Sequence, residues 1–348
     1  MLWPEEFQEL VNTWPHLPSA HPLSRFHAKF WGISLELERA EWRAAHAARL
    51  SSMGPDWSGT HEIKSTCYVL DIGFSELGVD KLWVRADYNH AYQCMKEHCP
   101  GTTERVLRSP SAVLTGSPGV GKTYFMIYAL RRRIGEQEIT LLYRDNTLYL
   151  FWEGGVHEVP RIPPQGFSYY KPWLLINSDE APKGVPPELL DQDTPYFVVY
   201  CASPPETRWL SMSKGTNPGR FVLNPWTKEE IHEVAAIRFE NPDLGAIDAV
   251  YDNYGPTPRL CIDYVADKAK LEEYKTSLDA LISTLSFEIV LSMVRSVQAL
   301  RPIDGAEKLF IIRRIGSSFS DLHSYKCDVT TRSLQSEIAV RMRKGTPT

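Results

Sequence analysis

The stretch LTGSPGVGKTYFMIYALRRR, residues 114–133, decides how this chain is expected to fold. Gly116, four further residues and then Gly121-Lys122-Thr123 have the spacing of a phosphate-binding loop. The apolar run SAVLTG enters the glycines and a helical run over 122–134 follows, so the sequence predicts a strand, a tight turn and a helix N-terminus. The N–H groups of such a turn and the helix dipole together form an anion site.

The loop contains each group that a nucleotide needs. The Lys122 ammonium can reach the β- and γ-phosphates, the Thr123 hydroxyl can ligate Mg²⁺, and Pro118 stiffens the turn. The sequence has no Asn-Lys-x-Asp guanine-reading motif, which favours ATP or ADP with Mg²⁺. The predicted nucleotide-binding residues are Gly116, Ser117, Pro118, Gly119, Val120, Gly121, Lys122 and Thr123.

Hydrolysis also needs an acid that holds Mg²⁺ and a group that orients the attacking water. The run LLINSDE, residues 174–180, ends in the candidates. In the preferred interpretation the strand extends to Ser178, Asp179 binds the metal and Glu180 orients the water. In the alternative, Asn177 takes the position directly after the aliphatic run and hydrolysis is weakened. A third interpretation gives the acids no role in catalysis, because Asp179 and Glu180 would simply lie in a solvated loop after a strand.

Two further polar residues are candidates for sensing the phosphates. Ser203 follows the apolar run VVYC, where many P-loop ATPases place a γ-phosphate sensor, although a Ser-Pro turn explains it equally well. Arg259 is the first residue of a predicted helix after GPTP and could contact the phosphates. The alternative is that it is an ordinary surface arginine after a turn. Arg208 and Arg220 are weaker arginine-finger candidates. The predicted catalytic set is Lys122, Asp179, Glu180, Ser203 and Arg259.

The pattern of elements indicates an α/β fold. Strand-like and helix-like runs alternate over 76–226, which predicts a mostly parallel sheet flanked by helices with ligands at the strands' carboxyl ends. TLYLFWEGGVHEV, residues 147–159, reads as two strands around a turn. A helix is expected over 34–50, and Thr227 with Glu230 spells a capping box. The predicted domains are an N-terminal mostly helical docking region (1–75), the core (76–226), a helical lid (227–275) and a C-terminal mixed region (276–348).

Composition limits the partners. The net charge of −5 argues against sequence-independent coating of DNA, although a local basic groove stays open. No run approaches the roughly 20 apolar residues of a membrane span, and the N-terminus lacks the regions of a secretory signal. Six scattered cysteines indicate free thiols, so we expect a cytoplasmic or nuclear protein with no membrane partner.

Several stretches together resemble a known family. KLWVRADYNHAYQCMKEHC, the phosphate loop, LYLFWEGGVHEVP, LNPWTKEEI and YGPTPRLC follow one another as in the P-loop NTPase module of the Crinkler and retrotransposon-hot-spot proteins, above all its fungal branch. The resemblance runs from about Leu82 to Tyr264. It implies an AAA-like (ASCE) or signal-transduction ATPase, often joined to a nuclease in host-directed effectors or mobile-element proteins. That family often has Asp where this chain has Asn177.

Three functions follow as expectations. The first is a Mg²⁺-dependent ATPase whose hydrolysis drives a conformational change in an effector or mobile-element-type protein. The second, favoured by Asn177, is a nucleotide-gated switch that acts through a partner protein of unknown identity. The third is an NTPase that regulates a nuclease. A homo-oligomer and a nucleic-acid partner stay open.

Three weaker patterns have simpler explanations. Asp56, Glu62 and Lys64 spell the order of a restriction-type nuclease motif, for which a chance match is preferred. His90, Cys94 and His98 are zinc-ligand types, with Cys99 next in sequence, but one straight helix sets the two histidines about 12 Å apart. Arg131, Arg132 and Arg133 are expected to oppose a helix dipole rather than to bind nucleic acid.

Overall fold

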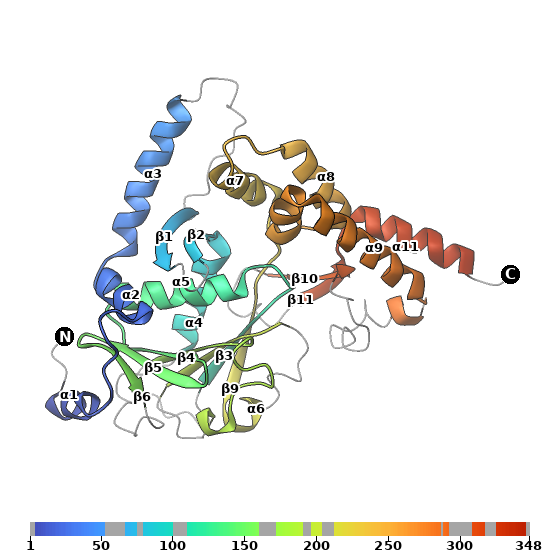
Figure 1. Cartoon of the computed structure of the whole chain (residues 1–348). Coiled ribbons are helices and arrows are strands. Elements are labelled where there is room, and N and C mark those ends of the chain that lie inside the picture. Colours follow the sequence, from blue (N-terminus) through green and yellow to red (C-terminus); the bar gives the residue numbers. More distant parts are fainter. Residues whose placement is uncertain are drawn as a thin grey trace. The chain divides into compact units, whose positions relative to one another are not determined.

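The computed structural model describes residues 4–52, 67–74, 79–99, 110–159, 172–190, 196–203, 212–286, 288–291, 308–316 and 325–345. The chain divides into two compact units (Figure 1). We call the first, Met1–Leu114, Thr123–Ala202 and Thr207–Gly219, the sheet unit. The second, Thr115–Lys122, Ser203–Glu206 and Arg220–Thr348, is the lid unit, and it includes most of the phosphate loop.

Seven strands form one sheet in the order β6-β5-β4-β7-β8-β3-β9. The neighbours β4, β7, β8 and β3 run parallel, and β5 and β6 add an antiparallel hairpin. This confirms the predicted α/β class with a mostly parallel sheet flanked by helices, and it confirms the two strands around the Glu153–Gly155 turn. The strands are β3 (Pro110–Thr115), β4 (Thr140–Arg144), β5 (Thr147–Trp152), β6 (Gly155–Val159), β7 (Trp173–Asn177), β8 (Phe197–Cys201) and β9 (Asn217–Val222).

The strand order places the carboxyl ends of β3 and β8 at a reversal of the topology. After β3 the chain passes β8 and β7 to reach β4, whereas after β8 it passes β3 to reach β9. Open α/β sheets bind ligands at such switch points. Every residue of β7 and β8 is buried, as expected for aliphatic strands covered on both faces.

The N-terminal region contacts the outer edge of this sheet. The Leu17 N–H donates to the Val156 carbonyl at 2.9 Å, and the Glu158 N–H donates to the Pro15 carbonyl at 2.8 Å, so this segment pairs with β6. Phe7 and Trp14 bury their rings in the core of the same unit. The edge of the sheet is thereby covered, which removes a template for pairing with other chains.

The remaining elements of the sheet unit are helices and one small hairpin. The helix expected over 34–50 is present as α3, and β1 pairs with β2 across the domain boundary predicted at residue 75. These elements are α1 (Glu5–Asn12), α2 (Pro22–Phe30), α3 (Leu35–Ser52), β1 (Tyr68–Phe74), β2 (Val79–Val84), α4 (Ala86–His98), α5 (Lys122–Gly135), the 3-10 turn η4 (Pro187–Leu189) and α6 (Met212–Gly215).

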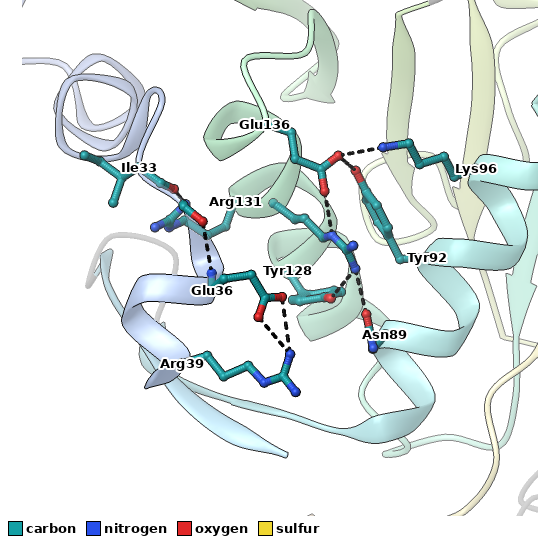
Figure 2. Close-up of polar contacts among 11 residues, drawn as sticks. Ile33, Glu36, Arg39, Asn89, Tyr92, Lys96, Tyr128, Arg131 and Glu136 are labelled. Carbon is teal, nitrogen blue, oxygen red and sulfur yellow. Dashed lines mark hydrogen bonds and ion pairs between the residues drawn. The ribbon is translucent and has the colours of Figure 1, made fainter. Parts of the chain in front are cut away.

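Arg132, near the end of α5, joins this helix to α4 through a network of polar contacts. Its guanidinium donates to Glu136 at 2.8 Å, to Asn89 at 2.7 Å and to the Tyr128 hydroxyl at 2.9 Å. Figure 2 shows the Glu136 carboxylate also accepting from Tyr92 and from a lysine of α4. These contacts hold the pKa of Glu136 below its usual range even though burial opposes that shift.

The two arginines beside it are also used inside the sheet unit. Arg131 is fully buried and contacts Glu38. It also donates to the Ile33 carbonyl of the α2–α3 region at 3.1 Å (Figure 2). Arg133 is buried, donates to the Ile139 carbonyl at 2.8 Å and lies over the Trp173 ring. The guanidinium groups therefore fasten α5 to its surroundings.

The lid unit combines helices with a second hairpin. Thr227 and Glu230 form the predicted capping box, and β10 pairs antiparallel with β11. Apolar side chains of α9, β10, β11 and α11 share one core, and α9 spans the boundary predicted at residue 275. The elements are α7 (Lys228–Arg238), α8 (Leu244–Tyr254), the π-helix η6 (Arg259–Tyr264), α9 (Lys268–Thr284), β10 (Phe310–Arg314), β11 (Tyr325–Val329) and α11 (Arg332–Gly345).

Across the described parts of the chain, no helix has both the length and the apolar character that a bilayer crossing requires.

Candidate phosphate-binding site

The glycines of the loop have conformations and neighbours that exclude larger residues. Gly116 and Gly119 have φ values of +150° and +79°, in the region that favours glycine. A Cβ at Gly116 would lie 2.9 Å from the Leu223 carbonyl oxygen, and one at Gly119 would lie 3.2 Å from Thr257 Cβ. The loop is therefore a tight turn from the end of β3 to the start of α5, as the spacing predicts.

Lys122 folds back over this turn. Its side chain is buried, and Nζ donates to the carbonyl oxygens of Gly116 and Ser117, both at 3.0 Å. An ammonium removed from water is stabilised strongly by a nearby anion. The Lys122 ammonium therefore lies against two neutral carbonyl acceptors of the turn, and its contact with a phosphate stays a prediction.

Residues outside the motif hold the loop in place within the lid unit. The Trp226 indole N–H donates to the Val120 carbonyl at 3.1 Å, and the Tyr251 hydroxyl donates to the Trp226 carbonyl at 3.0 Å. On β10, the Ile312 N–H donates to Ser117 Oγ at 3.0 Å. The sequence analysis did not predict these supports, although Trp226 lies in the LNPW stretch that carried the resemblance.

Asn177 is the residue of β7 that contacts Thr123, the last residue of the motif. The strand ends at Asn177, and its buried amide donates to Thr123 Oγ1 at 3.3 Å and to the Asp179 carboxylate at 3.2 Å. Asp179 itself is exposed. The amide therefore bridges the hydroxyl and the carboxylate, which brings together three of the residues considered for the metal site.

Glu180 lies on the other side of the same turn. Its carboxylate accepts a hydrogen bond at 3.0 Å from the N–H of Asp145, in the turn between β4 and β5. Asp145 has a φ of +52°, so this contact supports a left-handed turn residue. The structure gives Glu180 a local structural partner, and its role with water stays a prediction.

The other predicted residues have separate positions. Ser203 is half-buried two residues after the end of β8, and Arg220 is half-buried in β9. Arg259 is the exposed first residue of η6 and lines an open pocket together with Ser117, Pro118 and Gly119. Arg208 and the nuclease-like set Asp56, Glu62 and Lys64 lie outside the described residues.

The cysteines form no disulfide, and the suggested zinc ligands do not converge on a metal site in the described residues. All six cysteines are free thiols. Cys94 is buried with its sulfur 3.7 Å from His90 Nε2, while the His98 ring contacts that of Phe197. Within the described ranges, no group of three or more His, Cys, Asp or Glu side chains is arranged to hold a metal ion.

Comparison with known proteins gives a partial relationship. No protein-family model matches the chain. The chain is 30% identical over 191 residues to Crinkler effector protein 15 of Phytophthora infestans and equally similar to Crinkler effector protein 16 of that organism. The match covers 52% of this chain and 28% of the length of each relative. It supports a Crinkler-like relationship over half of the chain, and the assignment to a fungal branch stays a prediction.

Proposed function

We propose that this protein is a P-loop ATPase of the AAA-like (ASCE) type that binds ATP or ADP with Mg²⁺. The observation that carries the proposal is the buried Lys122 ammonium, held over a turn of positive-φ glycines at the N-terminus of α5. That turn follows β3, which ends at the switch point of the sheet, where ligands of open α/β folds bind.

The loop would hold the phosphates and the end of β7 would support the metal. Backbone N–H groups of residues 117–123 and the Lys122 ammonium supply the positive field for the phosphates. The Thr123 hydroxyl and the Asp179 carboxylate, joined by the Asn177 amide, are oxygen donors of the kind that Mg²⁺ prefers. Bound Mg²⁺ would neutralise the charge that develops on the terminal phosphate.

Hydrolysis is proposed to drive a conformational change, with Arg259 in the lid reading the nucleotide. Arg259 and the first half of the phosphate loop line one pocket. A guanidinium that contacts a terminal phosphate makes charge-assisted hydrogen bonds, which favour ATP over ADP. The lid unit then has two states that one ligand biases differently. In an effector or mobile-element-type protein, such a change would act on a partner.

A nucleotide-gated switch with little hydrolysis is the second candidate. It is favoured by the amide of Asn177 in contact with Thr123 at the place where the resembling family often has a carboxylate. With a neutral group there, the metal is held less firmly and turnover falls, whereas the phosphate contacts of Lys122 are unaffected.

Calorimetric titration with ATP and ADP, followed by a phosphate-release assay with ATP and Mg²⁺, tests both candidates. We expect nucleotide binding in the wild type and its loss by about tenfold or more in Lys122→Ala. A matched control is Lys183→Ala, an exposed lysine after β7. Turnover supports the ATPase, and binding without turnover supports the switch. Equal ATP affinity in wild type and a folded Lys122→Ala variant contradicts both.

A further inference from the structure

The lid unit contains an open pocket of about 390 Å³ beside the phosphate loop. Its walls come from loop residues 117–119, from η6 and α9, and from the β10–β11 hairpin. The pocket shares Arg259 and loop residues 117–119 with the proposed nucleotide site, but Lys122 and Thr123 do not line it. Its volume lies within the range of roughly 300–1,000 Å³ that small-molecule sites occupy.

One side of the pocket is aromatic. The rings of Tyr254, Tyr264 and Tyr274 line it, and the Tyr274 centroid lies 6.2 Å from the centroid of each of the other two. Edge-to-face packing of this kind fixes the rings against one another. A fixed aromatic wall suits a flat ligand that stacks on it or meets its edges.

The other polar groups of the wall carry an excess of positive charge. Arg259, Lys270 and Lys308 line the pocket, and Glu273 is the one carboxylate among the lining residues. Lys270 pairs with Asp267 at 3.1 Å, so Arg259 and Lys308 carry the excess charge. Lys308 Nζ donates to Ser277 Oγ at 2.6 Å and lies 5.4 Å from the centre of the Tyr274 ring. In the part of the chain that the structure describes, no carboxylate pairs with Arg259 or Lys308. A cation next to an aromatic face and free of an acidic partner favours an anionic ligand.

The pocket is also linked mechanically to the loop. Ile311 lines it, and the N–H of the next residue, Ile312, holds Ser117 Oγ at 3.0 Å. On the opposite wall, Thr257 lies against Gly119 so closely that a Cβ there would meet it at 3.2 Å. An occupant that displaces either wall therefore moves the N–H groups of the turn.

We infer that this pocket is a second ligand site, next to the nucleotide site, for a small aromatic anion that carries a planar ring and a phosphate group. The ring packs against the tyrosines and the phosphate is bound by Lys308. Binding there changes the affinity of the loop for nucleotide. This last effect rests on the proposed function, whereas ligand binding by itself does not.

The first experiment is fluorescence titration of the full chain with 1-naphthyl phosphate. Inorganic phosphate and 1-naphthol serve as probes that lack the ring and the charge, and we expect each to bind at least about tenfold more weakly. Lys308→Met keeps the aliphatic stem but removes the charge, so it should weaken the binding of 1-naphthyl phosphate by about tenfold or more. Lys308→Arg keeps the charge and should retain binding. The matched control is Lys326→Met, because Lys326 lies on β11, pairs with Asp328 and does not line the pocket.

The second experiment separates the two sites. Lys122→Ala should leave the affinity for naphthyl phosphate unchanged while it removes ATP binding. In the wild type, saturating naphthyl phosphate should change the Kd for ATP by about fivefold or more, and ATP should change the Kd of the probe by the same factor.

Each contrary result identifies which idea fails. Probe binding that is insensitive to Lys308→Met, or that is lost in Lys122→Ala, places the probe on the phosphate loop and refutes the second site. ATP binding without any naphthyl phosphate binding also refutes the second site and leaves the proposed function standing. Lys308-dependent probe binding without ATP binding keeps the second site and refutes the proposed function.

Discussion

The contact between Asn177 and Thr123 is the residue-scale feature that bears most directly on the proposed hydrolysis. The Asn177 amide donates to the Thr123 hydroxyl and to the Asp179 carboxylate, so it lies between the two groups proposed to bind Mg²⁺. The sequence predicted an acid after the aliphatic run but left open which residue would hold the position. The answer depends on where β7 ends, which periodicity does not determine within a residue or two.

We expect Asp179→Ala to lower Mg²⁺-dependent phosphate release by about tenfold or more, because it removes the carboxylate that the Asn177 amide joins to Thr123. Asn177→Asp should raise turnover, since it places a carboxylate against the hydroxyl. Glu180→Gln tests the water-orienting role in the same assay, with Glu188→Gln, an exposed side chain of η4, as the control. Wild-type rates in both Asp179→Ala and Glu180→Gln would show that the acids are wrongly assigned.

Arg259 carries a second prediction at this scale. Arg259→Ala should reduce the preference for ATP over ADP more than it reduces the affinity for ADP. The reason is that the guanidinium is proposed to contact only the terminal phosphate of ATP. Calorimetric Kd values for both nucleotides measure this. Arg332→Ala, an exposed arginine at the start of α11, is the comparison. An unchanged ATP-to-ADP ratio in Arg259→Ala leaves the residue as a surface arginine.

At the scale of elements, α5 carries the start of the site at one end and an arginine network at the other. The network around Arg132 and Glu136 connects two helices through partly buried charged groups. Because hydrogen bonds to charged groups contribute about 1.5–3 kcal/mol each when partly buried, the network stabilises the position of α5.

Arg132→Ala should therefore reduce the free energy of unfolding by roughly 1–3 kcal/mol, because Glu136, Asn89 and Tyr128 lose a shared donor. Urea unfolding followed by circular dichroism gives the value. Lys81→Ala, on an exposed position of β2, should change it by less than about 0.5 kcal/mol. If Arg132→Ala lowers the free energy of unfolding no more than Lys81→Ala does, the network does not contribute to stability.

Helices, strands and turns with strong local sequence signals could be predicted, whereas the division of these elements between compact units could not. The strand, loop and helix over 110–135, the β5–β6 hairpin and the capping box at Thr227 follow from spacing and turn residues. β1 pairs with β2 across the boundary predicted at 75, and α9 spans the one predicted at 275. Both groupings depend on contacts between residues far apart in sequence, to which periodicity is blind.

For the whole molecule, the seven-stranded sheet with its covered edge is the organising feature, and buried histidines sit at that edge. His27 donates to the Trp152 carbonyl at 2.7 Å and His157 donates to the Trp14 carbonyl at 3.2 Å. Burial is the main cause that lowers the pKa of both imidazoles below their ordinary value of 6.5. Both are therefore neutral in the folded chain at neutral pH.

A dependence of stability on pH follows. Below about pH 6.5 these histidines take up protons in the unfolded chain more readily than in the folded chain. The free energy of unfolding therefore falls as the pH drops below that value, and above it the contribution of the two histidines is fully present. We expect the Tm to decrease between pH 7.5 and 5.5, and His157→Asn to show a smaller decrease than the wild type. His232→Asn, in the lid unit, is the control. Equal pH dependence in wild type and His157→Asn would remove His157 from this account.

The pairing of the N-terminal segment with β6 also sets an order of events during synthesis. His157, the partner of Trp14, is synthesised 143 residues after it. At about 5–20 residues per second, that interval lasts roughly 7–29 s. Throughout that interval β6 is not yet made, so the apolar side chains of Phe7, Val11 and Trp14 lack part of the core that buries them and are accessible to chaperones. These residues therefore reach their native contacts well after they are synthesised.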